Sequence, residues 1–347
     1  MTSASTSSPG RRRASAAMTA TALAAVALLA VCLWHGSVDI PASEVWAALT
    51  GGHVKREAWR VIVIETRLPM ALTAILAGAG LSVAGLLLQT TFNNPLAGPS
   101  ILGVSTGASL GVAVVMLLFG GAAGMLQGSL GALAGAIAGA AVVMMMLLAM
   151  SKVVSSGAML LIAGIMVGYL ASSAISLMSF FASAQGIQGY VVWGLGSFSS
   201  TGFDRLGWLG APVIAALLGS LPLIKPMDAL LLGERYAASM GVNVKAARGA
   251  LLTVSGALTA FVTAFCGPVG FIGLAVPHMA RFLTSSSAHS TLVPATMLTG
   301  AATGLLCAAL TVMPSTGLLP VNAITPLIGV PVILYIIIRR RRLHYFN

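Results

Sequence analysis

The chain has 347 residues, of which 58% are hydrophobic and only 7% charged, and its mean hydropathy is +0.99. An ordinary soluble domain has about 25% charged residues, so this composition excludes a water-soluble fold. The formal net charge of +11 would suit nucleic acid only if the basic residues shared one polar surface, and here they abut apolar stretches. The sequence therefore indicates a membrane protein surrounded by lipid, with no nucleic-acid partner.

Ten apolar stretches are long enough to cross a bilayer, because a helical span needs about 20 largely apolar residues. They lie at 17–35, 68–89, 100–119, 124–150, 157–182, 206–224, 249–266, 268–283, 291–313 and 320–338. The first follows Arg11–Arg13 and so also has the layout of a signal peptide with a basic leader. Its longer apolar run and the nine stretches after it favour an uncleaved span. The predicted fold class is all-α and polytopic, with about ten transmembrane helices.

Charge is distributed unevenly over this predicted topology. With the N-terminus inside and alternating spans, thirteen basic residues lie on the cytoplasmic side, where the only acids are Asp228 and Glu234. Five basic and five acidic residues lie outside and cancel. The positive-inside bias therefore predicts that both termini are cytoplasmic. The expected organisation is a tail over 1–16, a transmembrane domain over 17–338 with a polar cytoplasmic loop at 225–248, and a tail over 339–347.

Every charged residue lies in a loop or at the end of a predicted span, so the predicted membrane interior contains no Asp, Glu, Lys or Arg, and the chain lacks the phosphate-binding pattern GxxxxGK[ST]. Proton-coupled carriers usually place ionisable residues inside the bilayer, and no pair of polar residues has catalytic spacing within a span. Cys32, Cys266 and Cys307 lie in apolar stretches without metal or redox spacing. The sequence favours the membrane half of a transporter powered by another polypeptide over a secondary transporter, a channel or an enzyme.

Glycine and proline mark two further features of the spans. Glycines recur at four-residue spacing, which lets helix backbones approach closely in lipid; they are Gly124/Gly128, Gly131/Gly135/Gly139, Gly164/Gly168 and Gly300/Gly304. Pro and Gly also interrupt the helical pattern at 94–103 and at 267–278. The first interruption lies on the cytoplasmic side and the second begins outside, which indicates that the two halves are related as an inverted repeat.

The polar loop 225–248 contains one short predicted helix. An amphipathic run begins at Glu234, and Gly241 is placed to end it as a C-terminal cap. Such a helix on the cytoplasmic face would dock a soluble partner, although the same residues would also suit a solvated connector between two spans.

Several motifs, by their order and spacing, resemble the FecCD family, the permeases of bacterial ABC importers for ferric siderophores, haem and vitamin B12. The match extends from about Arg67 to Arg339. Its parts are Arg67-Leu68-Pro69, Gly78-Ala79-Gly80-Leu81 with Gly85 and Gln89, Asn94-Pro95-Leu96-Ala97 with Pro99 and Ile101-Leu102-Gly103, Gly107-Ala108, Trp193-Gly194-Leu195-Gly196-Ser197-Phe198, Leu232-Gly233-Glu234 with Ala237 and Met240-Gly241, the block from Gly267 to His278 with Arg281, and Leu319-Pro320 with Leu327 to Pro331.

The resemblance implies a type II ABC importer permease of ten spans in the bacterial cytoplasmic (inner) membrane. Such a subunit forms a homodimer or a related heterodimer around a central path. A pair of cytoplasmic ABC ATPases would use ATP, so this chain would bind no cofactor and would not be an enzyme. An extracytoplasmic binding protein would deliver the substrate. An iron complex, siderophore or haem, is expected first, then vitamin B12, then another metal chelate or an oxyanion.

The resemblance also assigns roles to residues. The coupling helix, which sits in a cleft of the ATPase, would comprise Leu232, Gly233, Glu234, Arg235, Ala237, Met240, Gly241 and Asn243, with Glu234 and Arg235 as polar contacts. The cytoplasmic gate between spans 4 and 5 would comprise Ser155, Ser156, Gly157 and Ala158, which a plain turn would also fit. The recurrent structural positions are Asn94, Pro95, Gly103, Gly267, Pro268, Pro277, His278 and Arg281.

Two of the matched residues have alternative readings. Arg67 matches an external arginine that pairs with a carboxylate of the binding protein, and otherwise it would anchor span 2 at the interface. His278 has the chemistry of a metal or haem ligand, but its place after Pro277 near the cytoplasmic end of span 8 favours a structural role at a helix end.

The sequence departs from the family at four positions. Met70, Ala308, Val312 and Asn322 stand where the family usually has Arg, Asp, Arg and Gly. Fewer external charges remain for the binding protein, so docking would depend on Arg67 with neutral contacts, or on Arg60 and Arg205.

Overall fold

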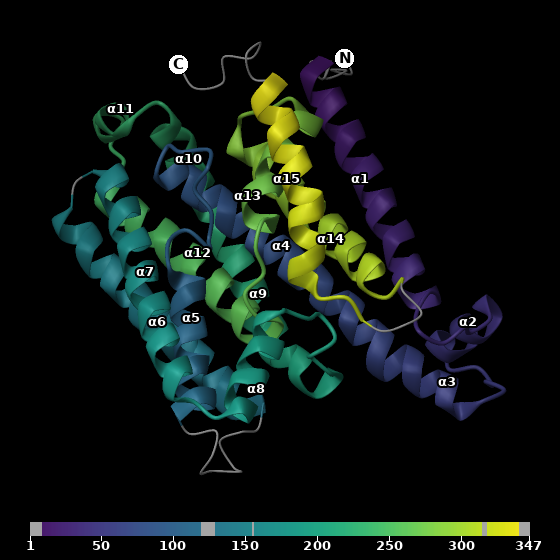
Figure 1. Ribbon diagram of the computed structural model, residues 1–347. Helices are drawn as coiled ribbons and strands as arrows, with labels where there is room; N and C mark the ends of the chain where they lie inside the picture. The colour runs from purple at the N-terminus through teal and green to yellow at the C-terminus, as the bar shows by residue number, and fades with distance from the viewer. Residues whose placement is uncertain (1–8, 119–128, 155, 314–317, 340–347) are drawn as a thin grey trace, which may run out of the picture.

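The computed structural model describes residues 9–118, 129–154, 156–313 and 318–339, and the regular structure within these ranges is entirely helical. Each of the ten predicted spans has a helical counterpart (Figure 1). These helices are α1 (Pro9–Trp34), α4 (Leu68–Thr91), α5 (Val104–Ala113) continued by the π-helical η2 (Val114–Leu118), α6 (Ser129–Val153), α7 (Gly157–Phe181), α9 (Phe203–Ser220), α12 (Val244–Cys266), α13 (Ile272–Thr284), α14 (His289–Thr311) and α15 (Val321–Arg339). The all-α polytopic fold is therefore confirmed.

Shorter helices connect the spans. They are α2 (Ala42–Thr50), α3 (Glu57–Val61), the π-helical η1 (Ile62–Arg67), α8 (Ala184–Gly194), the 3-10 turn η3 (Leu221–Leu223), α10 (Ile224–Leu231) and α11 (Glu234–Ser239). Of these, the sequence predicts only α11. Hydropathy does not predict α2, α3 and α8, because each is shorter than a span and has no long run of apolar residues.

Several boundaries differ from the predicted ones. Helix α1 begins at Pro9 rather than at 17, inside the predicted tail, and α12 begins at Val244 rather than at 249. The span predicted over 268–283 is helical only from Ile272, because Gly267 and Phe271 have positive φ (76° and 64°). With 13 residues, α13 is about 20 Å long, which is less than the roughly 30 Å of a bilayer core.

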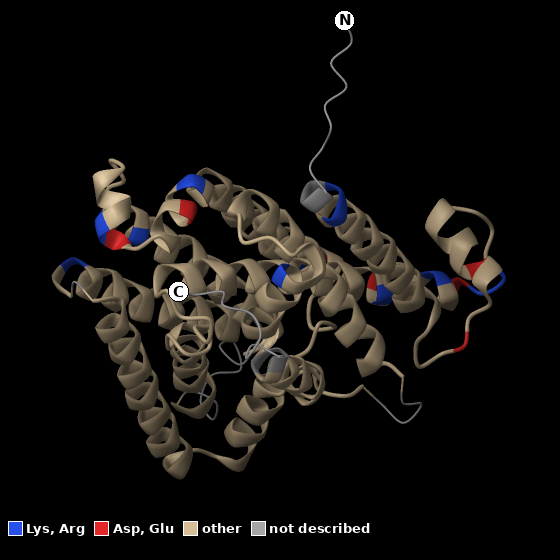
Figure 2. Ribbon diagram, turned by 90° about the horizontal axis from the view of Figure 1, so that it is seen from above, with Lys and Arg blue, Asp and Glu red and all other residues tan. Residues whose placement is uncertain are grey.

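The two ends of the bundle differ in charge. The start of α1, the end of α15, and α10 and α11 lie at one end, here called the basic end, while α2, α3 and α8 lie at the opposite end (Figure 1). Lys and Arg lie on α1, α10 and α11, with Asp228 on α10 and Glu234 on α11, whereas basic and acidic residues mix more evenly around α2 and α3 (Figure 2). The structure therefore separates the charges as the predicted topology requires.

Helix α4 is the centre of the bundle. Most of its residues are buried, and it packs against α14, α12, α13 and α9. A Cβ on Gly78 would collide with the carbonyl of Gly300, and one on Gly85 with the carbonyl of Gly273. Gly135 and Gly139 of α6 meet α5 in the same way. Close helix packing at the spaced glycines, where both partners are described, is thus confirmed.

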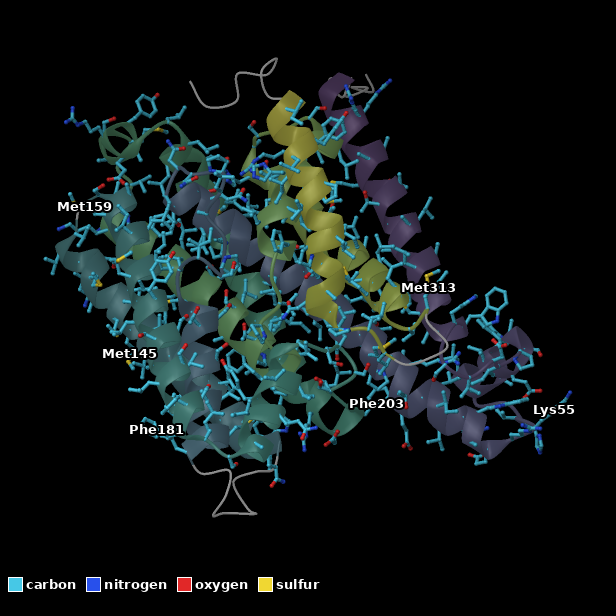
Figure 3. All side chains as sticks on the ribbon, in the orientation of Figure 1. Lys55, Met145, Met159, Phe181, Phe203 and Met313 are labelled. Atoms are coloured by element: carbon cyan, nitrogen blue, oxygen red, sulfur yellow. The ribbon has the colours of Figure 1, made fainter. Side chains whose placement is uncertain are left out.

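Helices α6 and α7 form a side of the molecule with large exposed apolar residues. Met145 of α6 and Met159 and Phe181 of α7 are exposed and point away from the bundle (Figure 3). A soluble protein rarely exposes so many large apolar groups together, so this side faces lipid or another subunit.

The α4–α13 contact predicts a difference between two glycines. We expect Gly85→Ala to lower the free energy of unfolding by about 1–3 kcal/mol, because the added methyl group overpacks a backbone contact. Gly207→Ala, in α9 with open space around it, should leave stability unchanged or slightly raised. Thermal unfolding of both purified variants in detergent measures this, and equal stability of the two would contradict the close contact.

Candidate functional site

Helices α10 and α11 form a short pair that projects from the basic end (Figure 1). Gly233, with φ of 98°, separates them. Helix α11 ends in a Schellman motif, in which the N–H of Val242 donates to the carbonyl of Ala237 and that of Gly241 to the carbonyl of Ala238, each at 3.0 Å. Gly241 has φ of 83°, which favours glycine. The predicted short helix with Gly241 at its C-terminal cap is confirmed.

One side of α11 is anchored and the other is free. Ala237 is fully buried against the bundle, whereas Leu232, Tyr236 and Met240 are 64%, 53% and 60% exposed. These three residues are here called the apolar knob. Large apolar side chains that project from an end rich in charge are typical of an interaction surface.

The polar residues of the predicted coupling segment behave differently from one another. Glu234 forms an ion pair with Arg248 of α12, whose side chain is buried while that of Glu234 is half exposed. Arg235 is exposed. Asn243 caps α12, because its Oδ1 accepts the N–H of Ala246 at 3.0 Å. Glu234 therefore already has an ion-pair partner within the chain, which the sequence did not suggest.

The predicted gate lies where α6 turns into α7, at the basic end. Ser155 is outside the described residues. Ser156 caps α7 by accepting the N–H of Met159, and Gly157 faces Phe92 at the end of α4. Ala158 is exposed. The geometry is that of a capped turn against α4, and gating by these residues stays a prediction.

The two segments interrupted by Pro and Gly meet in space. The ring nitrogen Nε2 of His278 lies 2.8 Å from the carbonyl oxygen of Pro95, and Pro99 packs against Gly273. The amide oxygen of Gln89 accepts from Arg281 at 2.8 Å. His278 thus joins the middle of α13, rather than its end, to the turn after α4.

Local backbone geometry explains the other motif residues in these segments. Asn94 accepts the N–H of Leu96 at 2.9 Å in an Asx turn. Gly103 has φ of 78° and begins α5 against Gly164 of α7. Pro277 lies inside α13.

Asn322 ties three segments together at the start of α15. Its Nδ2 donates to the carbonyls of Gly194, at 2.9 Å, and of Pro268, and its Oδ1 accepts the N–H of Gly270 at 3.3 Å. Gly267, before Pro268, packs on the carbonyl of Trp193. A glycine at this position could make none of these side-chain bonds.

Arg67 is enclosed at the opposite end. It is 4% exposed, and its guanidinium donates to the carbonyl of Leu33 at 2.9 Å and to those of Trp34 and Val38. Leu33 and Trp34 belong to the last turn of α1, whose carbonyls have no partner within the helix. Arg67 is therefore an internal cap for α1, and its predicted contact with a binding protein stays a prediction to be weighed against this role.

One polar constellation at the basic end was not foreseen from the sequence. Asp228 of α10 bonds to His289 of α14, and His289 lies next to Thr90 of α4. In the sequence, Asp228 stands out only as one of two acids on the predicted cytoplasmic side. The residues are far apart along the chain, so only the presence of single polar residues at the ends of apolar stretches could have pointed to them.

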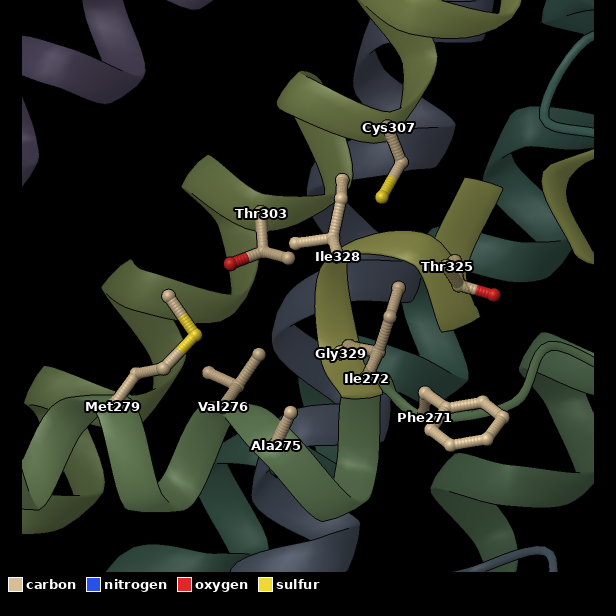
Figure 4. Close-up of a pocket in the computed structure, with 10 residues that line it drawn as sticks. All are labelled: Phe271, Ile272, Ala275, Val276, Met279, Thr303, Cys307, Thr325, Ile328 and Gly329. Atoms are coloured by element: carbon tan, nitrogen blue, oxygen red, sulfur yellow. The ribbon is translucent and has the colours of Figure 1, made fainter. Parts of the chain in front are cut away.

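A small pocket lies between α13, α14 and α15 (Figure 4). Its lining is mostly apolar, with Phe271 and Thr325 at one side, Met279 at the other and Cys307 above them in the view. The lining residues carry no charge, so the pocket offers no charged group for recognising a ligand. Within the described ranges, no three His, Cys, Asp or Glu side chains gather in a way that could hold a metal ion.

The fold and the basic end define a class of protein. Seven helical stretches within the described ranges are long and apolar enough to cross a membrane, three shorter helices complete the predicted spans, and the short helix α11 projects from one end. Such a chain is a multi-pass membrane transport subunit. The sequence profile of the FecCD transport family matches residues 23–339. The chain belongs to this family of ABC importer permeases.

Known relatives agree with this assignment. The vitamin B12 import system permease protein BtuC of Shigella boydii serotype 18 (strain CDC 3083-94 / BS512) is 32% identical over 321 residues, covering 92% of this chain and 94% of the relative. BtuC of Escherichia coli O9:H4 (strain HS) is 31% identical over the same length. A solved ABC transporter assigned to the metal-chelate type, in an inward-facing conformation, is similar with a TM-score of 0.81 and 27% identity, covering 93% of this chain and 98% of that one.

The enclosure of Arg67 predicts a stability effect. We expect Arg67→Gln to lower the free energy of unfolding by about 2 kcal/mol, because charged hydrogen bonds to buried carbonyls are lost. Arg56→Gln is the control, because Arg56 is exposed and its guanidinium carbon lies 5.1 Å from the ring centre of Trp59. Loss of this contact should lower the free energy of unfolding by at most about 1 kcal/mol. Thermal unfolding measures both. Unchanged stability of Arg67→Gln, together with weaker binding of the partner binding protein, would favour a docking role instead.

Proposed function

We propose that this chain is the permease subunit of an ATP-driven importer that carries a metal chelate across the bacterial cytoplasmic membrane, with an iron complex, siderophore or haem, as the first candidate. The observation that carries the proposal is the apolar knob on an anchored helix at the basic end. Membership of the FecCD family supports it. The structural similarity to a transporter assigned to the metal-chelate type supports the substrate class.

The basic end faces the cytoplasm in this proposal. The acids described there are Asp228 and Glu234, and both bond to residues of the same chain. The excess of Lys and Arg at this end follows the positive-inside bias. Both termini are then cytoplasmic, as the sequence predicts.

The apolar knob is the contact with a cytoplasmic ATPase. Ala237 fixes α11 to the bundle, so Tyr236 and Met240 are held out where a cleft of a soluble partner can enclose them. A cleft that buries such residues gains roughly 1.5–3 kcal/mol for a fully buried large apolar side chain. The gate turn at Ser156–Ala158 lies at the same end of the bundle. It opens the path towards the cytoplasm when the ATPase moves α11.

The path itself is formed with a second permease subunit. Helices α7 and α8 carry no charged residue, yet Ser172, Ser173 and Ser176 of α7 and Gln185 and Gln188 of α8 are exposed. Polar groups facing lipid are costly, so these residues suit a water-filled path shared by two subunits. Hydroxyl and amide groups without charge suit a bulky chelate that must be released again.

Vitamin B12 is the second candidate substrate. The curated relatives are named as vitamin B12 import permeases and match nearly the whole chain. An uncharged path accommodates a corrinoid as well as an iron complex, so the geometry of one subunit does not discriminate between them.

A binding protein docks at the opposite end. Because Arg67 is enclosed, the exposed residues Lys55 and Arg56 beside α3 are the cations that this end offers to a partner carboxylate. Arg60 and Arg205 are less open, because each pairs with an acidic neighbour.

Charges placed in the apolar knob should abolish ATPase binding. We expect Tyr236→Asp with Met240→Asp to lower co-purification of the ATPase at least about tenfold, because carboxylates would be desolvated in the cleft. Phe203→Asp is the matched control, since Phe203 is an exposed aromatic residue at the start of α9, at the opposite end (Figure 3). Full ATPase recovery with the double variant would contradict the proposal.

Reconstituted transport tests the function directly. The permease, its ATPase and its binding protein are placed in liposomes with ATP enclosed on the cytoplasmic side, and uptake of an iron-radiolabelled hydroxamate siderophore, haem and cobalt-radiolabelled cyanocobalamin is measured. We expect ATP-dependent uptake of an iron complex. Uptake of cyanocobalamin alone would select the second candidate, and substrate uptake without ATPase or ATP would overturn the proposal in favour of a secondary transporter.

A further inference from the structure

We propose that Asp228, His289 and Thr90 form a positioning linkage that transmits movement of α11 to the central pair α4 and α14. The inference rests on the proposed function, because it needs an ATPase that moves α11. No family motif quoted above contains any of the three residues, and they come from three separate helices.

The first bond of the linkage joins α10 to α14. Oδ1 of Asp228 accepts the backbone N–H of His289 at 2.9 Å and the ring Nδ1–H of the same residue at 2.7 Å. His289 is the first residue of α14, so the carboxylate also lies at the positive end of the helix dipole. Two bonds from one oxygen fix the start of α14 relative to α10 in both distance and direction.

The second bond reaches the central helix. The other ring nitrogen of His289, Nε2, lies 2.9 Å from the hydroxyl oxygen of Thr90 in the last turn of α4. His289 is fully buried and Thr90 nearly so, while the side chain of Asp228 is 42% exposed. The imidazole therefore lies between an exposed carboxylate and the interior, and shielding from water makes the inner bond stronger than an exposed one.

The linkage lies on one of the two sets of helix contacts through which a movement of α11 can reach the bundle. Helix α11 packs chiefly against α10 and α12, and α10 in turn packs against α14 and α4. Each route carries one polar link: Glu234 to Arg248 towards α12, and Asp228 to His289 towards α14. Both carboxylates are partly exposed, the side chain of Glu234 at 50% and that of Asp228 at 42%, so exposure does not distinguish the two routes. The α14 route ends on a helix pair locked by backbone contact.

The rigidity of α4 and α14 gives the linkage its effect. Gly78 meets the carbonyl of Gly300, and Gly304 that of Ala74, so neither helix can slide without breaking close contact. A displacement of α10 that pulls on His289 is therefore passed to both helices together. The end of α4 also contacts the gate turn, because Gly157 faces Phe92. The linkage thus connects the docking helix with the turn that lines the exit.

The test separates transmission from folding by using isosteric variants. Thr90→Val removes the hydroxyl but keeps the shape, Thr90→Ser keeps the hydroxyl, and Asp228→Ala removes the carboxylate. Thr91→Val is the matched control, because Thr91 is buried in the same turn and its hydroxyl bonds to the carbonyl of Leu87 as that of Thr90 bonds to the carbonyl of Leu86, while Thr90 has the bond to His289 in addition. Each variant is reconstituted with ATPase and binding protein, and both ATP hydrolysis and uptake of the iron-radiolabelled siderophore are measured.

We expect Thr90→Val to lower the number of substrate molecules imported per ATP hydrolysed by at least about threefold, and Asp228→Ala by about tenfold. ATPase co-purification should be retained, Thr90→Ser should restore most of the ratio, and Thr91→Val should match the wild type. A purely structural role would lower the yield of protein without changing this ratio.

Two outcomes would overturn the inference, and they differ from failure of the proposed function. An unchanged ratio in Thr90→Val refutes the linkage even if Asp228→Ala fails to fold. An equal loss in Thr91→Val shows that any hydroxyl in this turn matters, which also refutes it. If the wild-type complex shows no ATP-driven uptake of any of the three substrates, the proposed function itself falls.

Discussion

The positions of most other helices and turns in the bundle depend on the backbone contact of α4 with α13 and α14. In lipid, helices gain no hydrophobic free energy from meeting one another, so close packing and hydrogen bonding must hold them. Gly78, Gly85 and Gly300 remove the side chains that would keep the backbones apart. Because α4 is fixed in this way, its last turn and the following Asn94–Gly103 segment are held at the basic end, where α10, α13 and the gate turn attach.

Polar bonds in this protein gather where helices begin, end or break. Arg67 closes the last turn of α1, Asn322 joins the interrupted start of α13 to α8 and α15, and His278 joins α13 to the turn after α4. Irregular backbone inside a membrane must have its polar groups satisfied by the protein. These side chains meet that requirement, so the chain can interrupt its helices where movement or a path is needed.

The sequence was sufficient for the spans and insufficient for the bonds between them. Hydropathy predicts all ten helices, and Gly241 marks the end of α11, because both signals are local. The capping role of Arg67 and the pairing of Glu234 with Arg248 depend on which residues meet after folding. Asp228 and His289 are 61 positions apart, and a single pair of polar residues has no periodicity to reveal it. The helices α2 and α8 are too short and too slightly apolar for a search at the length of a span.

The apolar knob has a consequence for how the assembled complex responds to ionic strength. Leu232, Tyr236 and Met240 carry no charge, and the nearest acid, Glu234, is already paired with Arg248. Attraction between exposed charges is screened within about 8 Å at physiological salt, whereas burial of apolar surface is not weakened by added salt. In the proposed assembly, an ATPase held by this knob would therefore stay bound in concentrated salt, while a binding protein held through Lys55 and Arg56 would bind more weakly, so added salt would loosen the contact on only one side of the membrane.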